Sequence, residues 1–345
     1  MGQRANLIIF SNNSYELYYS HWCANSLTKD LFWGPTHALN YVRMQKRVHN
    51  KIGWLDEVWA EGGAVIDLDK KIFLLYGGED LLTDIPLRRV YMRLLSQPWN
   101  GWEVKWTYEG IADLAGYVGY PKSKVLKQAE AESITFTPPK EKEWLNLIMS
   151  VKFVDGCTKV FPLDGMIEDF LCYGPKMIAI IDKSHGYEEI IVPEWTSTFP
   201  LGGFHVDVAE RTLDYWLADV APGLLMKIKE KWCGWKVNWH MDCFESHIEK
   251  TKGRIILHDR SLSDMVDNLR DMLLQENEYD PANELVQLSE KLSRQGKTVQ
   301  INSYALNNPR YELKREVRED IFNRAIQTSF AVSGKLLILC QSLNR

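Results

Sequence analysis

The sequence predicts an α+β fold built from two diverged copies of one sheet-and-helix unit, a pseudo-twofold pair, with a C-terminal α/β extension. Three observations support this prediction: blocks of residues recur in one order, each block is typical of a hairpin, helix or strand, and the last part of the chain matches neither copy. We expect the first copy at 1–120, a linker at 121–143, the second copy at 144–252 and the extension at 253–345.

The internal repeat consists of four blocks. Three of them recur 140 positions later and the fourth 133 positions later, which implies a deletion between the last two blocks. The fourth block aligns three tryptophans and a glycine, which exchange rarely with other residues. Such ordered self-similarity is typical of a duplication. The blocks are 6–8 with 146–148, 31–35 with 171–175, 62–67 with 202–207, and 99–106 with 232–239.

Each copy is predicted to contain a hairpin, a helix and a strand. Residues 64–68 and 72–76 are rich in β-formers around a turn at 69–71, and 204–216 repeat this pattern. The Gly-Gly pair before each hairpin is expected to supply positive φ angles. A helix should follow from Asp84 to before Pro98, and a shorter one over 221–231. Alternation over 102–106 predicts a half-buried strand.

The remaining segments are predicted from composition and periodicity. The polar linker should hold one short helix. In the extension we expect helices at 261–275, 281–294 and 311–328, and strands at 298–301 and 336–340. The extension could be a third domain or a cover on the duplicated core.

Composition narrows the functional classes. The chain of 345 residues has a net charge of -5 and a pI near 6.0, which gives no electrostatic footprint for nucleic acid. No apolar run spans a membrane, no signal peptide is visible, and the six cysteines form no C-x-x-C pair. We therefore expect a cytoplasmic protein without cofactors, with neither nucleic acid nor membrane as a partner.

The first candidate site is a cysteine–histidine pair in the first copy. His21 and Cys23 are two residues apart and would share one strand face, while Glu61, Asp67 or Asp69 could orient the histidine. The alternative is a hydrogen-bonded core histidine and a small buried thiol.

The second candidate site is a metal site among the acids of the first hairpin. Asp67 and Asp69 offer oxygen ligands, although their spacing fits no calcium loop. Asp207 matches Asp67 across the copies, and a shared structural hydrogen bond would explain this match equally well.

The second copy has its own candidates. His240 and Asp242 alternate on one strand face and could be metal ligands, together with residues nearby that include His205 and His247. His205 and His240 align with Val65 and Thr107 of the first copy, so a site here would belong to the second copy alone.

Two tryptophans are candidate binding residues. Trp99 and Trp232 precede equivalent strands, and we expect them to be exposed, whereas Trp102 and Trp106 should pack in the core.

The first 120 residues resemble a group of uncharacterised bacterial proteins. Segments 4–9, 15–22, 54–56 and 61–69 carry the resemblance. It implies a bacterial origin and assigns no role to any residue.

The function expected from these patterns is non-enzymatic binding. An immunity or regulatory partner of another protein fits, with that protein or a small ligand in a cleft between the repeats. The alternative is a metal-dependent or Cys/His-based hydrolase that uses His21 and the first-copy acids. A hydrolase should gather His21, Glu61 and Asp67 in one open pocket, whereas a binding protein should bury them separately and expose aromatic side chains.

Overall fold

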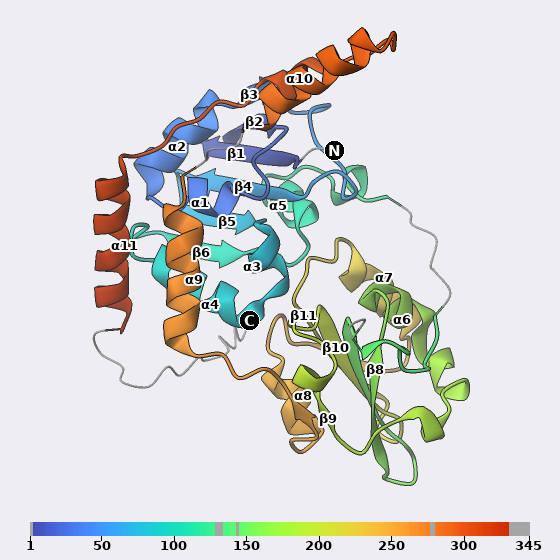
Figure 1. Ribbon diagram of the computed structural model, residues 1–345. Coiled ribbons are helices and arrows are strands. Elements are labelled where there is room, and N and C mark those ends of the chain that lie inside the picture. Colours follow the sequence, from blue (N-terminus) through green and yellow to red (C-terminus); the bar gives the residue numbers. More distant parts are fainter. Residues whose placement is uncertain (1–2, 128–133, 143–144, 277–279, 331–345) are drawn as a thin grey trace. The chain divides into compact units, whose positions relative to one another are not determined.

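The computed structural model describes residues 3–127, 134–142, 145–276 and 280–330 and forms two compact units (Figure 1). Unit 1 comprises the described residues within Met1–Glu79, Leu87–Lys127 and Ser261–Leu336. Unit 2 comprises those within Asp80–Pro86, Gln128–Arg260 and Leu337–Arg345. The described part of the extension from Ser261 onwards therefore belongs to the unit that contains the first copy, whereas residues 253–260 belong to unit 2. Within the described residues, no helix is both long and apolar enough to cross a membrane.

Unit 1 is organised around a six-stranded sheet in the order β3-β2-β1-β4-β5-β6. The pairs β1–β4 and β5–β6 are parallel, and the other neighbours are antiparallel. The strands are β1 (Ala5–Ser11), β2 (Ser14–Ser20), β3 (Lys46–Val48), β4 (Gly62–Asp67), β5 (Ile72–Tyr76) and β6 (Glu103–Trp106).

The first part of the chain supplies helices around this sheet, and the extension supplies α9 and α11, which lie beside each other (Figure 1). The helices of the first 127 residues are α1 (Leu27–Asp30), α2 (Pro35–Met44), α3 (Glu79–Thr83), α4 (Ile85–Leu95), α5 (Ile111–Tyr117) and η1 (Lys122–Lys124). The extension contains α9 (Leu262–Leu274), α10 (Pro281–Arg294), η6 (Ser303–Leu306) and α11 (Arg315–Phe330). Its three expected helices are confirmed. The strand expected at 298–301 is wrong, and the one at 336–340 lies outside the described residues.

Unit 2 holds a five-stranded sheet in the order β12-β11-β10-β7-β8 and a two-stranded one, β13-β9. The strands are β7 (Leu147–Lys152), β8 (Thr158–Leu163), β9 (Ile190–Ile191), β10 (Gly202–Asp207), β11 (Thr212–Leu217), β12 (Lys236–Trp239) and β13 (Ile255–Ile256). The helices are α6 (Ile167–Tyr173), η3 (Gly174–Ala179), η4 (Lys183–His185), η5 (Val192–Glu194), α7 (Leu224–Lys231) and α8 (Glu245–Lys250).

The two large sheets repeat one topology. In unit 1 the order β2-β1-β4-β5-β6 has the same parallel and antiparallel pairs as β8-β7-β10-β11-β12 in unit 2. This agreement confirms the predicted α+β fold with a duplicated sheet-and-helix unit.

Trp99 and Trp232 belong to the core, so the expectation that they are exposed is wrong. Each indole N–H donates to a carbonyl of the second repeat block, Trp99 to Leu31 (3.0 Å) and Trp232 to Leu171 (2.7 Å). Each ring also meets the next tryptophan edge-on at 5.1 Å. The sequence misplaced them because the chain before the strand is a closed helical turn, in which Trp99 N–H donates to Leu95.

Two details of the repeat differ from the prediction. Gly62 and Gly202 occupy equivalent positions in the two copies. On the neighbouring strands Ala5 pairs with Gly62 and Leu147 pairs with Gly202. Ala5 therefore corresponds to Leu147, and the offset of the first block is 142 positions instead of the predicted 140. The Gly-Gly pairs lie inside β4 and β10 and have no positive φ. They provide space instead: a Cβ on Gly63 would lie 2.6 Å from Leu114.

Candidate functional site

The first-copy candidates do not gather in one pocket. Asp67 ends β4 and accepts the backbone N–H groups of Asp69 (2.8 Å) and Lys70 (2.9 Å) and the Tyr117 hydroxyl (2.5 Å). Glu61 precedes the first residue of the same strand. At about 3.3 Å per residue, the six residues of β4 separate the Cα atoms of these two residues by roughly 20 Å. Asp67 therefore closes the hairpin turn and has no contact with Glu61.

His21 and Cys23 are both buried, but they have different partners. The Nδ1 atom of His21 lies 2.7 Å from the Tyr19 hydroxyl, while Ser20 and Tyr41 hydrogen-bond to the Cys23 thiol. Burial raises the pKa of Cys23 to about 12. A thiol with such a pKa carries almost no thiolate near neutrality, so this geometry gives the cysteine hypothesis no activated nucleophile.

The proposed metal ligands are engaged in other bonds. Asp69 accepts the backbone N–H groups of Asn12 (3.0 Å) and Asn13 (3.1 Å), which ties the β1–β2 turn to the β4–β5 turn. His240 faces Asp214 rather than Asp242, with Nε2 2.7 Å from Oδ1. Among the residues that the structure describes, no group of three or more His, Cys, Asp or Glu side chains could hold a metal ion.

The structure brings together a different set of residues in unit 2. Strand register places Ser150, His205, Asp214 and Asn238 side by side on β7, β10, β11 and β12. We call these four residues the polar row. Ser150, His205 and Asp214 are buried, so a line of polar groups crosses a sheet inside the protein.

The corresponding positions of unit 1 are mostly apolar. Ile8, Val65 and Leu74 stand in the same register on β1, β4 and β5, and all three are buried. On β6 the equivalent residue is Lys105. Burying polar groups costs free energy unless they are hydrogen-bonded, so three exchanges in one line indicate a specific role in unit 2.

Helix α8 completes this cluster with His247, which is buried where α5 has Leu114. Ser150 Oγ lies 2.7 Å from His205 Nδ1 and 2.7 Å from His247 Nε2. Trp216 Nε1–H donates to His247 Nδ1 at 3.2 Å. Gly203 makes room for this imidazole, because a Cβ there would lie 2.9 Å from Nδ1.

Asp214 is the acidic member of the row. Burial raises the pKa of its carboxyl, but hydrogen bonds from His240 and Asn238 and the charge of Lys250 outweigh burial and hold the pKa below its usual value. Lys250 Nζ lies 3.4 Å from Oδ2. The carboxylate therefore orients His240, whose side chain is partly exposed. A carboxylate orients a histidine in the same way in many acid–base catalysts.

His205, His240 and His247 were candidates from the sequence, whereas Ser150 and Asp214 were missed. Neither residue belongs to a motif that the sequence shows, and the first-copy counterpart of Ser150 depends on the two-residue register correction. Aligning the copies by their strand pairing would have revealed both.

A second feature is the loop between β3 and β4, residues 49–61, which we call the 49–61 loop. Three large apolar side chains on it are exposed: Ile52 (84%), Val58 (60%) and Trp59 (48%). The guanidinium of Arg4 lies 4.4 Å from the centroid of the Trp59 ring.

This loop is held firmly despite its exposed side chains. Asn6 donates to Gly53 O (3.2 Å) and accepts Leu55 N–H (2.7 Å), and Trp54 stacks on Tyr120 at 5.0 Å. Asp56 accepts the backbone N–H groups of Val58 (3.1 Å) and Trp59 (3.3 Å). The loop thus presents its apolar groups from a fixed backbone.

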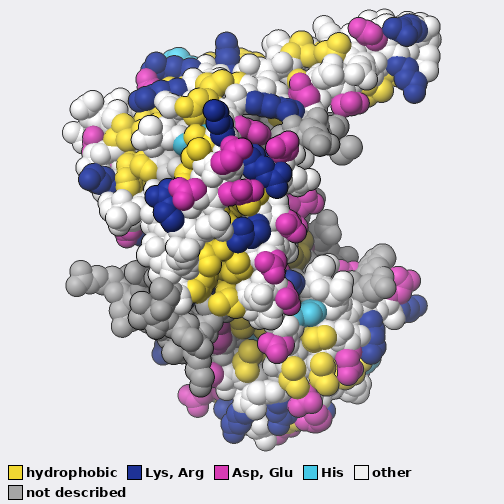
Figure 2. Space-filling view, turned by 60° about the vertical axis from the view of Figure 1, so that its left-hand side comes forward, with side chains coloured by type: hydrophobic (Ala, Val, Ile, Leu, Met, Phe, Trp, Pro, Cys, Tyr) yellow, Lys and Arg dark blue, Asp and Glu magenta, His cyan; other side chains and the backbone are white. Residues whose placement is uncertain are grey.

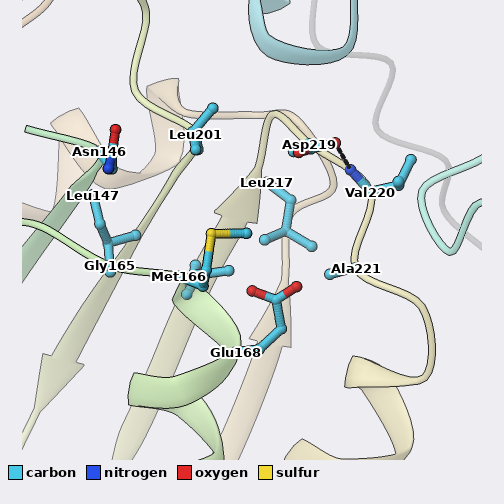
Figure 3. Close-up of a pocket in the computed structure, with 11 residues that line it drawn as sticks. Asn146, Leu147, Gly165, Met166, Glu168, Leu201, Leu217, Asp219, Val220 and Ala221 are labelled. Carbon is cyan, nitrogen blue, oxygen red and sulfur yellow. Dashed lines mark hydrogen bonds between the residues drawn. The ribbon is translucent and has the colours of Figure 1, made fainter. Parts of the chain in front are cut away.

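A small cavity in unit 2 lies at the start of α6 (Figure 3). Glu168 points into it towards Leu217, and burial raises the pKa of Glu168. The volume of about 10 Å³ is close to that of one water molecule, so this cavity is too small for an organic ligand.

Comparison with protein-family models, with curated proteins and with solved structures finds no match for this chain.

Proposed function

We propose that the chain is a non-enzymatic binding protein that recognises another protein through the 49–61 loop. The observation that supports this proposal most directly is the exposure of Ile52, Val58 and Trp59 on one anchored loop. Tryptophan is among the residues enriched at the energetic centres of protein interfaces. A loop that is already fixed also loses little conformational entropy on binding.

The positions of the candidate catalytic residues of the first copy favour a binding protein over the hydrolase alternative. His21 and Asp67 lie in separate hydrogen-bonded environments, and Cys23 is a buried thiol. An enzyme based on His21 and the first-copy acids would need them in one pocket.

The distribution of surface charge is also compatible with recognition of a partner through shape complementarity and apolar contacts. On the face shown in Figure 2, Lys and Arg side chains are interspersed with Asp and Glu, and hydrophobic side chains lie among them. The net charge of -5 is small for this length. Binding to an apolar protein surface does not require an electrostatic potential of one sign across the binding face.

The experiment compares two exposed valines. A photo-cross-linking amino acid is placed at position 58 or at position 154, which carries Val154 on the β7–β8 turn of unit 2 (76% exposed). Extracts of the source cells are irradiated with each full-length variant, and the cross-linked protein is identified by mass spectrometry. Position 58 should yield a specific adduct, and position 154 should not.

Affinity then tests the contribution of the loop. For the identified partner, Val58→Ser with Trp59→Ala should raise Kd about 30-fold or more, since a tryptophan hot spot contributes about 2 kcal/mol. Val154→Ser should leave Kd unchanged. Thermal unfolding controls for folding, because all three side chains are exposed. Equal affinity of the double variant and the wild type would overturn the proposal.

A further inference from the structure

Ser150 and His205 of the polar row form a hydrogen-bonded chain with His247 and Trp216, and this chain has one direction. An indole N–H can only donate, so Trp216 requires an unprotonated Nδ1 on His247. The His247 proton then sits on Nε2 and is donated to Ser150 Oγ, and the Ser150 hydroxyl proton goes to His205 Nδ1. These three hydrogen bonds all form only while both imidazoles are neutral.

Burial keeps both imidazoles neutral at pH 7. His205 and His247 are 2% and 3% exposed. Burial lowers the pKa of His205 to about 4 and that of His247 well below its usual value. Nearby carboxylates oppose this effect only in part, and nearby cations reinforce it. The carboxylates are Asp207 on β10 and Asp214 on β11, and the cations are Lys152 on β7 and Lys250 on α8. For His247, the neighbouring imidazoles of His205 and His240 also act to lower the pKa.

Protonation would disrupt the chain at a defined point. A proton on His247 Nδ1 would face the Trp216 N–H across 3.2 Å, and the imidazolium would have no acceptor there. A second charge on His205 would be created next to the first, because both rings contact one hydroxyl. Two buried like charges are unstable, and α8 is the short element that carries His247.

We propose that the hydrogen-bonded chain from Trp216 through His247 and Ser150 to His205 is an acid-triggered switch, which releases α8 from the large sheet of unit 2 while the equivalent α5 of unit 1 stays in place. The sign follows from linkage. Both histidines bind protons more weakly in the folded state than in the unfolded state. The stability that the neutral histidines give to the folded state is therefore complete above pH 6.5, and it is lost as the pH falls from there towards 4.

Unit 1 provides the internal control. Its helix α5 places Leu114 against Gly63 of β4, and Ile8 and Val65 occupy the positions that Ser150 and His205 have in unit 2. None of these apolar side chains titrates. At pH 5 each histidine with an unfolded pKa of 6.5 favours the open state by a factor of about 30. Hydrogen exchange of the full chain, corrected for the pH dependence of the intrinsic rate, should show protection in α8 and β10 falling between pH 7 and pH 5 by about 30-fold for each histidine that opening exposes. Protection in α5 and β4 should change less than twofold, and return to pH 7 should restore α8.

Two variants test the cause. Ser150→Ile with His205→Val and His247→Leu installs the residues of unit 1 and should abolish the pH dependence of α8. If this triple variant does not fold, His205→Val alone should reduce the loss of protection at pH 5 by about 30-fold relative to the wild type. Unchanged protection of wild-type α8 down to pH 5 would refute the switch. So would a pH response that persists in the folded triple variant, or one that is undiminished in the folded His205→Val variant.

Discussion

Asp67 and Asp207 end equivalent strands, and each accepts the backbone N–H of the residue three positions further on, Lys70 at 2.9 Å and Glu210 at 3.1 Å. The other carboxylate oxygen differs, since Asp67 accepts from Tyr117 and Asp207 from Lys152. The shared bond explains why both copies have aspartate here. The sequence could show the match but not its cause, because a turn cap and a metal ligand require the same side chain.

The buried thiol of Cys23 leads to a prediction on reactivity. With a pKa of about 12, about one molecule in 10 000 carries the thiolate at pH 8, so iodoacetamide should modify Cys23 at least 100-fold more slowly than the exposed Cys233. Peptide mapping after timed alkylation measures both rates. In concentrated urea the two rates should converge. Rapid modification of Cys23 in the folded protein would contradict the burial described above.

At the scale of elements, matching glycines set the entry to the second helical segment of each copy. Gly34 and Gly174 have φ angles of +96° and +76°, and a Cβ on them would lie 2.9 Å from Pro98 O and 3.1 Å from Lys231 O. Pro98 and Lys231 directly precede the buried tryptophans, so two distant repeat blocks pack against each other in the same way in both copies. The glycines were visible in the sequence, but their close contacts are far apart in the chain and could not be deduced from it.

Substitution of Gly34 separates backbone strain from steric contact. Gly101 also has a positive φ (+81°), but its Cβ would meet nothing within 4 Å. Gly101→Ala should therefore cost about 1 kcal/mol of unfolding free energy, from strain alone. Gly34→Ala should cost at least about 1 kcal/mol more, because the Pro98 carbonyl must move. Urea titrations followed by tryptophan fluorescence measure the difference. Equal losses of unfolding free energy in the two variants would show that the backbone around Gly34 and Pro98 shifts without cost to accommodate the methyl group.

Most elements were predictable from local patterns, and the errors share a cause. Hairpins and helices follow from periodicity, as 72–76 and 281–294 show. The offset of the first block was wrong by two because a short apolar strand gives no marker of register, and its alternation is unchanged by a shift of two. The strand expected at 298–301 did not form, since propensity alone supplies no partner strand.

At the scale of the molecule, the described residues of the extension from Ser261 onwards belong to unit 1 and do not form a third unit. Phe322 of α11 is fully buried and lies 6.3 Å from Phe32, and the Trp22 indole donates to Ala305 O at 2.8 Å. The amphipathic pattern predicted helices here, but not the surface that they cover, because that surface is made by residues more than 200 positions earlier.

A single substitution on α11 tests this assignment. Phe322→Ala should lower the stability of unit 1 by about 3 kcal/mol, since it empties a fully buried site. Hydrogen exchange should show faster opening of β1 and β4, with β7 and β10 unchanged. Leu288→Ala on the exposed face of α10 is the matched control and should change neither set. Faster exchange in unit 2 alone would contradict the assignment.

The closure of unit 1 by α11 has a consequence for biosynthesis. A ribosome makes the chain from its N-terminus, so Phe32 emerges long before Phe322, and the whole of the second copy is made in between. At roughly 5–20 residues per second, the apolar surface beneath α11 should wait on the order of 10–60 s for its cover. We therefore expect nascent chains that stop before residue 315 to engage chaperones through the first copy, even though that copy is synthesised first.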